Sequence, residues 1–502
     1  MFDMISITIL NYLVQFFMLL LGLGILAIIV MYIIDVTQTS QTIRRNYPVI
    51  GRFRYFFEHL GEFFRQYFFA MDREELPFNR SERSWVYRAA KHVDRTIAFG
   101  STRNLTLNGS IYFLNSAFPT LDEDAVEPSL VTLGANCRYP YSTSSIINIS
   151  AMSYGALSAP AIKALSLGAK KAGCWMNTGE GGLSPFHLQG GADLIFQIGT
   201  AKYGVRDEDG HLSDDKLKKI AAHKEVKMFE IKLSQGAKPG KGGILPAEKV
   251  SAEIAEIRNI PEGQASISPN GHLDIKKPED LLNMVHHIRE VTGKPVGFKF
   301  VLGEQSWFEN LLVLMHKKGQ DYYPDFITLD GSDGGTGAAP QPLMDFVGMP
   351  LKESLPWLTD QLNQADLKQH IKVIASGKLI TPSSVAWALS MGADFVNSAR
   401  GFMFALGCIQ AMQCNKNTCP TGITTHNKKL QRGLVPANKA ERIAHYHQGI
   451  SYDVGIIAHS CGVTNPRKLR RRHVRIITDN GMSIPLDQMH PEPIKIIENM
   501  SV

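Results

Sequence analysis

The feature that most constrains this fold is a repeat of short β-rich runs, each followed by an amphipathic stretch. Eight such runs occupy residues 145–153, 173–181, 195–199, 228–236, 295–303, 325–335, 372–379 and 394–401. Helical patterns lie between them, for example at Ala159–Ala172, Ser251–Ile260, Pro278–Val291 and Pro382–Met391. Eight β–α units in about 260 residues predict an α/β protein built on a (β/α)8 TIM barrel. A doubly wound sheet is the alternative, but no G-x-G-x-x-G motif opens a first helix.

Polar residues cluster where these runs end. They are Met152, Ser153, Glu180, Gln197, Lys232, Gln235, Lys299, Asp330, Ser332, Asp333, Ser376 and Arg400. Active sites of (β/α)8 barrels lie at the C-terminal ends of the strands. A barrel that serves only as a scaffold needs no such mixture of acids, cations and amides there, so the sequence predicts an enzyme.

Glycine-rich motifs follow the last three runs: GSDGGTGAA (Gly331–Ala339), ASGK (Ala375–Lys378) and SARG (Ser398–Gly401). Barrels of this kind often bind phosphate with the loops after strands seven and eight. Glycine also lets backbone N–H groups approach an anion closely. Any one motif alone is typical of a tight turn, but three together predict a phosphate-bearing cofactor such as FMN.

A second motif, EIKLSQGAKPGKGG (Glu230–Gly243), places Lys232, Gln235 and Lys238 three residues apart. Two ammonium groups can neutralise a dianionic substrate, and an amide can orient a carbonyl. Arg258 on the following helical pattern is a candidate clamp for a second carboxylate. The alternatives are a solvated basic loop and a surface arginine.

Glu180 lies in NTGEGG (Asn177–Gly182) and therefore presents a carboxylate with little shielding by its neighbours. A positioned base beside a cationic site is the functional interpretation. A glutamate that stabilises a turn is the structural one.

Three of the six cysteines, Cys408, Cys414 and Cys419, lie within twelve residues, and Pro420 follows the last. Zinc sites usually show two C-x2-4-C pairs or accompanying histidines, which are missing here. Iron–sulfur clusters take cysteine thiolates, often with a proline after the last ligand. Three ligands suit a three-iron cluster or a four-iron cluster with one exchangeable corner, whereas buried structural cysteines are the alternative. The isolated Cys137, Cys174 and Cys461 are expected in the core.

The N-terminal region contains no charged residue from Ile5 to Ile34, and Val14–Ile34 is long enough for the ~20 residues that span a bilayer. A signal peptide is less consistent with this run, since its apolar core is too long, no basic region precedes it and no cleavage site follows. A buried helix of a soluble protein is the other alternative. Arginines follow the run, which predicts a single-pass anchor with the catalytic body in the cytoplasm.

Aromatic residues at helical spacing come next: Phe53, Phe56, Phe57, Phe63, Phe64, Tyr67 and Phe68, with Leu60 on the same face. Arg52, Glu58, Glu62 and Arg65 lie between them. Such a helix either docks on the main domain or lies in the membrane interface.

The net charge of the whole chain is modest. The net charge of +6 is too small to indicate a nucleic-acid partner. Six basic residues crowd Asn465–Arg475. A solvated face is expected there, and the alternative is a patch for an acidic electron carrier or anionic lipid.

Taken together, residues 145–425 resemble the FMN-binding synthase domain of glutamate synthase. The matching motifs are SAMSYGALS (Ser150–Ser158), NTGEGG, QIGTAKYGV (Gln197–Val205), EIKLSQGAKPGKGG, ISPNGHLDI (Ile267–Ile275), LDGSDGGTGAAP (Leu329–Pro340) and ALGCIQAMQCNKNTCPTGI (Ala405–Ile423). The pairing of EIKLSQGAKPG with the cysteine spacing is highly specific.

The resemblance implies a barrel that binds FMN, with Cys408, Cys414 and Cys419 holding a [3Fe–4S] cluster. It implies that Lys232, Gln235, Lys238 and Arg258 line the flavin and 2-oxoglutarate site, and that Glu180 faces the incoming ammonia or imine. The predicted cofactor-binding residues are Ala151, Met152, Ser153, Gln197, Lys232, Lys299, Ser332, Asp333, Gly334, Gly335, Thr336, Gly337, Ser376, Gly377, Arg400 and Gly401.

Two departures from the family pattern bear on the substrate. The family carries a glutamine at Ile244 and tends to carry a second histidine at Leu273. The family's glutaminase, β-helical and NADPH modules have no counterpart in the sequence, so ammonia and electrons are expected from elsewhere.

The leading hypothesis is reductive amination of a 2-oxo acid, 2-oxoglutarate plus ammonia to L-glutamate, with electrons from a ferredoxin-like carrier or quinone entering through the iron–sulfur cluster. A membrane-anchored dehydrogenase of an amino acid or N-alkyl amino acid is the second hypothesis, and a non-catalytic redox sensor the third. The expected organisation is an anchor (residues 1–35), a juxtamembrane region (36–100), the barrel with its cysteine segment (101–430) and a C-terminal extension (431–502). A homo-oligomer is compatible with the sequence.

Overall fold

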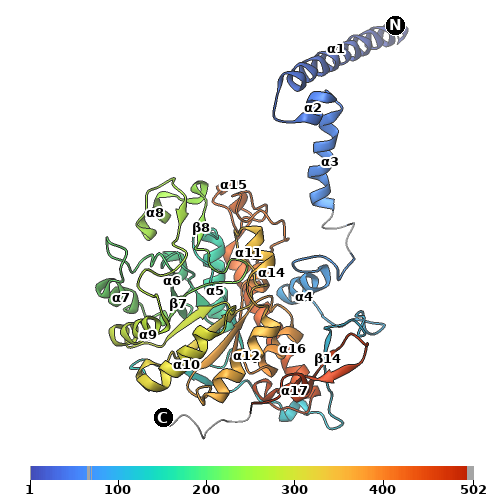
Figure 1. The fold of residues 1–502 in the computed structure, drawn as a ribbon. Helices are drawn as coiled ribbons and strands as arrows, with labels where there is room; N and C mark the ends of the chain where they lie inside the picture. Colours follow the sequence, from blue (N-terminus) through green and yellow to red (C-terminus); the bar gives the residue numbers. More distant parts are fainter. Residues whose placement is uncertain (1, 65–67, 69–70, 494–502) are drawn as a thin grey trace. The chain divides into compact units, whose positions relative to one another are not determined.

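The computed structural model describes residues 2–64, 68 and 71–493 (Figure 1). Two compact units divide the chain, one ending at Arg80 and the other beginning at Ser81. Their boundary falls inside the predicted juxtamembrane region. Arg65 and Tyr67 of the aromatic segment lie outside the described residues.

The second unit is built on a closed barrel of eight parallel strands. In chain order they are β4 (Ile147–Ile149), β5 (Met176–Asn177), β6 (Leu194–Ile198), β7 (Val226–Lys232), β10 (Val296–Phe300), β11 (Phe326–Asp330), β12 (Lys372–Ser376) and β13 (Phe395–Ser398). Every strand lies inside or beside one of the eight predicted runs, and β13 pairs with β4 to close the ring. The predicted (β/α)8 barrel is confirmed.

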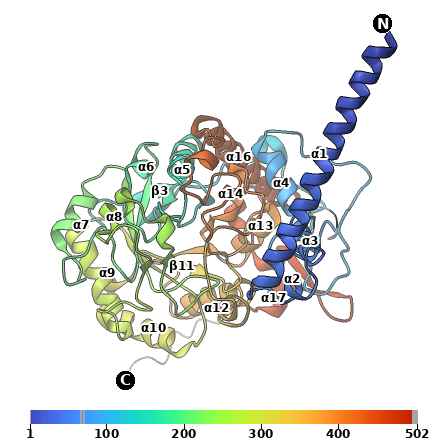
Figure 2. The same cartoon turned by 90° about the horizontal axis from the view of Figure 1, so that it is seen from above.

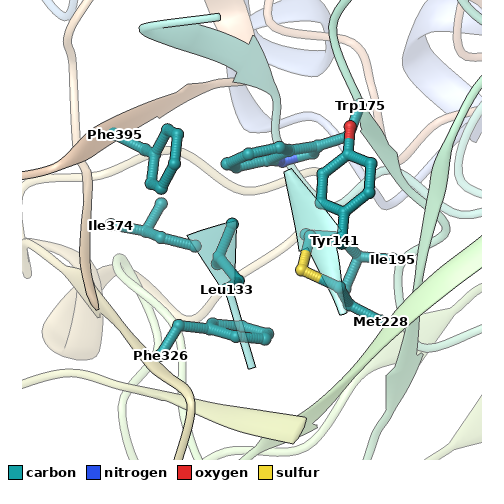
Figure 3. Close-up of a cluster of buried hydrophobic side chains, with 8 residues drawn as sticks. All are labelled: Leu133, Tyr141, Trp175, Ile195, Met228, Phe326, Ile374 and Phe395. Atoms are coloured by element: carbon teal, nitrogen blue, oxygen red, sulfur yellow. The ribbon is translucent and has the colours of Figure 1, made fainter. Parts of the chain in front are cut away.

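The N-terminal end of the barrel is plugged by apolar side chains. The antiparallel pair β2 (Val131–Leu133) and β3 (Tyr141–Thr143) supplies Leu133 and Tyr141. They pack with six residues in the first halves of barrel strands, at their centres or just before them: Trp175, Ile195, Met228, Phe326, Ile374 and Phe395 (Figure 3). A sealed, apolar bottom leaves the opposite end for polar chemistry.

The predicted helices also form. Helix α5 (Ala159–Ala172) has the predicted bounds, because Ser158 caps its first turn and Gly173 ends it in the left-handed conformation. Predicted helices likewise appear as α8 (Ala252–Arg258), α9 (Pro278–Thr292) and α13 (Pro382–Ser390). The long helix α16 (Pro436–Ser460) packs on α5 (Figure 2).

Helix α4 (Arg80–Ala90) joins the barrel unit through aromatic contacts. The ring of Trp85 meets Tyr446 of α16 edge-on at 6.1 Å between centroids, and Tyr87 meets Phe404 in the same way. The Tyr87 hydroxyl also donates to the Cys408 carbonyl at 2.6 Å. The chain therefore contacts the cysteine segment soon after it enters this unit.

The basic stretch near the C-terminus corrects one expectation. Arg471 is buried and forms an ion pair with Asp360 at 2.5 Å. Arg467 lies over the Phe395 ring and donates to the carbonyl of Ser145 at 3.2 Å. The prediction that the basic residues of Asn465–Arg475 form a solvated face is therefore wrong for Arg467 and Arg471. These two side chains contact the barrel.

The first unit contains α1 (Phe2–Thr37), α2 (Thr42–Asn46) and α3 (Gly51–Phe64). Within α1, Ile7–Thr37 is long and apolar enough to cross a membrane, and its most apolar window is not buried in the structure. This segment contains the predicted span.

Candidate active site

Glu180 and Lys232 form an ion pair at the C-terminal end of the barrel. Glu180 follows β5, Lys232 ends β7, and their charged atoms are 2.8 Å apart. Glycines make room for the carboxylate: a Cβ at Gly199 would lie 2.5 Å from the Glu180 Cβ, and one at Gly243 would lie 2.5 Å from its Oε1. The backbone thus closes around Glu180 in a way that larger residues would prevent.

The charge state of Glu180 follows from its neighbours. Burial raises the pKa of this carboxyl, but the charges of Lys232, Lys238 and Arg258 outweigh burial and leave the pKa below its usual value. Glu180 is therefore an anion that is held beside three cationic side chains.

Lys238 and Arg258 are both buried. Burial, with help from Lys232, lowers the pKa of Lys238 to about 8, whereas Glu180 acts in the opposite direction. Arg258 donates to the Tyr154 carbonyl at 3.2 Å and lies over the Tyr203 ring. The structure thus brings Arg258 into the neighbourhood of Glu180 and excludes the surface interpretation of this arginine.

Glu230 is a site residue that the sequence analysis missed. Its fully buried carboxylate accepts hydrogen bonds from Asn177 at 2.8 Å, Gln197 at 2.7 Å and Thr328 at 2.5 Å. These donors come from β5, β6 and β11, so one carboxylate joins four strands of the barrel. An acidic residue inside the apolar run MFEIK was the available signal.

A second buried ion pair joins β10 to β11. Lys299 lies 3.1 Å from Asp330, whose Oδ2 also accepts the Gly236 N–H at 2.9 Å. Burial lowers the pKa of Lys299, but Asp330 and Glu230 outweigh it, so the pKa is raised. Lys299 is therefore a permanent cation at the mouth of the barrel, tied to the loop after β7.

Gln235 links two of the predicted motifs. Its side-chain oxygen accepts a hydrogen bond from Lys232, and its amide nitrogen donates to the Thr336 hydroxyl at 3.1 Å. The lysine-rich loop and the glycine-rich loop after β11 therefore lie side by side.

The glycine-rich loops after β11 and β12 also converge. Gly331 donates to the Ser376 carbonyl at 2.8 Å, and a Cβ at Gly377 would lie 3.2 Å from the Gly331 nitrogen. A Cβ at Gly337 would meet no atom within 4 Å, so the chain is open there. The loops after β11 and β12 therefore lie against each other, next to an open segment at Gly337.

The remaining predicted cofactor residues have varied surroundings. The Asp333 carboxylate accepts the Leu351 N–H at 3.2 Å, and the Ser332 carbonyl accepts Ala237 N–H at 2.9 Å. A Cβ at Gly401 would collide with the Tyr446 hydroxyl, so this glycine also serves helix packing. Ala151, Met152, Ser153, Gly334 and Gly335 lie in the loops after β4 and β11.

Arg400 stands between the glycine-rich loop and the cysteine segment. One guanidinium nitrogen donates to the Thr336 carbonyl at 2.6 Å, and the other lies 3.7 Å from the Cys414 sulfur. Burial lowers the pKa of Arg400, but the charges of Cys414, Cys408 and Cys419 raise it above its usual value. Arg400 therefore contacts the cysteine segment through the Cys414 sulfur.

Lys249 supports the same segment from the other side. Its buried ammonium group donates to the carbonyls of Thr424 at 2.6 Å, Cys414 at 2.7 Å and Ala156 at 3.3 Å. Burial lowers its pKa to about 8. One side chain therefore joins the cysteine segment to the loop after β4.

The three cysteines do not form a closed ligand set here. Among the described residues, no group of three or more His, Cys, Asp or Glu side chains is arranged to hold a metal ion. Cys408 and Cys419 are buried and Cys414 is partly exposed. Burial raises the pKa of Cys408 to about 11. The predicted core cysteines Cys137, Cys174 and Cys461 are all buried, as expected.

Comparison with known proteins settles the family. Residues 110–464, more than half of the chain, match the family described as the conserved region in glutamate synthase. The chain belongs to the glutamate synthase family. The glutamate synthase large subunit-like protein YerD of Bacillus subtilis is 38% identical over 521 residues, with 96% of this chain and 98% of YerD covered.

Other members of the glutamate synthase family match only in part. The archaeal glutamate synthase (NADPH) of Methanocaldococcus jannaschii is 36% identical over 66% of this chain, and the chain spans 61% of that protein. Among solved structures, that of mandelate oxidase with (S)-4-hydroxymandelic acid is similar at a TM-score of 0.46 and 15% sequence identity. The match covers 79% of this chain and 99% of the mandelate oxidase chain. The predicted glutamate synthase-like enzyme is confirmed at the level of the family.

Proposed function

We propose that this family member catalyses FMN-dependent reductive amination of a 2-oxo acid, converting 2-oxoglutarate and ammonia to L-glutamate. The observation that carries the proposal is the Glu180–Lys232 ion pair with buried Lys238 and Arg258 around it. A dicarboxylate needs two cations, and ammonia needs an acceptor for its proton. This site offers both within one neighbourhood.

FMN is the proposed cofactor, and when bound it supplies hydride transfer. The open backbone at Gly337 and the converging loops after β11 and β12 would hold its phosphate. Lys299 would supply a fixed positive charge and Gln197 an amide near the ring. The membership of the chain in the glutamate synthase family supports the same cofactor.

Each site residue has a defined task in this proposal. Lys238 and Arg258 bind the two carboxylates of the substrate and orient its carbonyl carbon. As ammonia adds to that carbon, Glu180 takes the proton that nitrogen loses and returns it to the oxygen that leaves as water. Before this transfer, Lys232 stabilises the charged Glu180 carboxylate. Gln235 fixes the Lys232 ammonium group through its side-chain oxygen. Positioning and electrostatics are the contributions of the protein.

We further propose that Cys408, Cys414 and Cys419 bind an iron–sulfur cluster that receives electrons from an external carrier, either ferredoxin-like or a quinone. The spacing of the cysteines, the contact of Cys414 with Arg400 and the membership of the chain in the glutamate synthase family support this.

The apolar helix α1 supports a membrane anchor. Arg44, Arg45, Arg52 and Arg54 follow its apolar part, so the catalytic unit is proposed to face the cytoplasm.

The decisive experiment supplies 2-oxoglutarate, ammonium and a reduced carrier to anaerobically purified protein and measures L-glutamate, flavin and iron. We expect glutamate from the native enzyme. Glu180→Gln should lower the rate by about 10²–10⁴-fold, the range typical of general acid–base groups. Glu208→Gln changes an exposed glutamate and serves as the control. Absence of product together with absence of 2-oxoglutarate binding would disprove the substrate assignment.

A second function, oxidation of an amino acid or N-alkyl amino acid with quinone as acceptor, is favoured by Ile244. This residue lies on β8 (Ile244–Leu245), opposite Ile267 of β9 (Ser266–Ile267), and so provides an apolar side chain instead of the family's glutamine. Quinone reduction with a panel of amino acids separates the two functions.

A further inference from the structure

The apolar helix α1 ends in a buried carboxylate. Asp35 is completely shielded from solvent, although the residues around it on α1 are exposed. Its Oδ1 accepts hydrogen bonds from Arg44 at 2.6 Å and Arg52 at 2.9 Å, and its Oδ2 accepts Arg52 at 2.8 Å and the Val49 N–H at 3.0 Å. We call Asp35, Arg44 and Arg52 the arginine clamp.

The arginine clamp joins α1, α2 and α3, the helices that the structure describes within residues 2–64. Asp35 belongs to α1, Arg44 to α2 and Arg52 to α3. Two guanidinium groups neutralise the only acidic residue near the end of the apolar run and leave an excess of positive charge. A lone carboxylate at that depth would be expensive in a bilayer, whereas a paired one with outward cations suits the headgroup region.

The turn between the helices is also held by short-range contacts. The Gln38 amide donates to the carbonyls of Asp35 and Gln41 at 3.0 and 2.9 Å. A Cβ at Gly51 would lie 2.8 Å from the Ile43 carbonyl oxygen, so α3 starts in direct contact with α2. The direction in which α3 leaves α1 is therefore set by packing and hydrogen bonds.

Helix α3 leaves this turn with an exposed aromatic face. Phe53, Phe56 and Phe57 are each more than half exposed, at 59%, 57% and 60%. Their spacing puts them on one side of the helix, with Arg54 and Glu58 on the other. The rings of Phe53 and Phe57 stack at 6.4 Å between centroids. A row of aromatic rings opposite charged residues is the composition of helices that lie at a membrane surface.

We infer that α3 is a membrane-interface helix whose Phe53–Phe57 face contacts the acyl chains of a phospholipid bilayer, at an orientation fixed by the arginine clamp. The inference rests on the proposed anchoring of α1. The arginine clamp holds the start of α3 at the end of α1. Because α1 would itself lie in the bilayer, the bilayer is the surface that the aromatic face of α3 would contact. The exposed Arg45 and Arg54 suit anionic headgroups.

Tryptophan emission from the full-length protein tests this arrangement in vesicles of phosphatidylcholine and phosphatidylglycerol, with and without bromine on the acyl chains. Phe57→Trp reports on the aromatic face, Glu58→Trp on the opposite side, and Leu23→Trp on the span. The wild-type protein in the same vesicles supplies the background from its native tryptophans. We expect bromine to remove most of the added emission of Leu23→Trp and Phe57→Trp and little of that of Glu58→Trp.

The outcomes separate the inference from the anchor. Quenching of Leu23→Trp without quenching of Phe57→Trp would show that protein, either the barrel unit or a second copy, covers the aromatic face, and would overturn the inference alone. No quenching of Leu23→Trp would overturn the anchor and the inference together. Adding Asp35→Ala to Phe57→Trp should reduce the quenching, and unchanged quenching would refute the role of the clamp. Retained flavin in that variant shows that the barrel unit is folded.

Discussion

The Lys232 ammonium group lies 2.8 Å from the Glu180 carboxylate, although strand β6 separates their strands in the barrel. The two side chains meet because the residue directly after β6 is Gly199, beside which the Glu180 side chain passes. The ion pair at the mouth of the barrel thus depends on the absence of a Cβ at Gly199.

Gly199→Ala should therefore impair catalysis without removing any functional group. The new Cβ would lie 2.5 Å from the Glu180 Cβ, so the carboxylate must move. A displacement of about 1 Å can cost about 10²-fold in rate, and we expect a fall of that order in kcat. Gly433→Ala, where a Cβ meets nothing within 4 Å, is the matched control. An unchanged kcat in Gly199→Ala would show that the position of Glu180 is not critical.

Lys238 should produce a pH dependence of substrate capture. Burial lowers the pKa of Lys238 to about 8, so the ammonium form that binds a carboxylate is lost as the pH rises through about 8. We expect kcat/KM for 2-oxoglutarate to fall over that range. Lys238→Arg should move the fall to higher pH, because guanidinium keeps its proton. In the control Lys241→Met the profile should match that of the native enzyme. If Lys238→Arg leaves the pH dependence of kcat/KM unchanged, the titrating group is not Lys238.

Glu230→Gln should destabilise the barrel. The glutamine amide would present a donor where Asn177, Gln197 and Thr328 all donate, and Lys299 would lose a neighbouring anion. Removing one partner from such a buried network typically costs about 3–5 kcal/mol. Urea unfolding followed by circular dichroism measures the change. Glu256→Gln on the exposed side of α8 should stay within about 0.5 kcal/mol of the native protein. A similarly small effect of Glu230→Gln would contradict a structural role for the network.

Lys249→Met should loosen the cysteine segment. The substitution leaves the carbonyl groups of Ala156, Cys414 and Thr424 without their ammonium donor, and that of Thr424 is buried. A buried group left without a partner costs about 1–3 kcal/mol, and the segment is expected to relax. Iron per flavin should fall, and thiol titration of the anaerobic protein should show faster reaction of the cysteines. Lys416→Met, an exposed neighbour, is the control. Equal iron contents and thiol rates in the two variants would refute this role for Lys249.

Much of the fold follows from local sequence signals. Helix α5 has its predicted bounds because Ser158 and Gly173 stop the helix by mechanisms that act within a few residues. The β-rich runs predict the strands for the same reason, since eight buried parallel strands need eight apolar segments. The residue types at the strand ends then indicate where the site lies.

The contacts among those residues do not follow from local signals. Glu230 resembles an outward-facing residue of a strand until Asn177, Gln197 and Thr328 surround it. Arg471 resembles part of a solvated basic run, yet it pairs with Asp360, a partner 111 residues away. Partners so distant along the chain are chosen by barrel closure and helix packing.

The sequence by itself determined the barrel, the family motifs, the apolar N-terminal helix and the chemical types at the site. Each of these depends on periodicity, composition or spacing within a short segment. Only the tertiary structure decided that Glu180 meets Lys232 past Gly199, that Arg258 is buried beside them, and that Asp35 joins three helices. Those relationships depend on distances between segments, and such distances exist only after the chain has closed on itself.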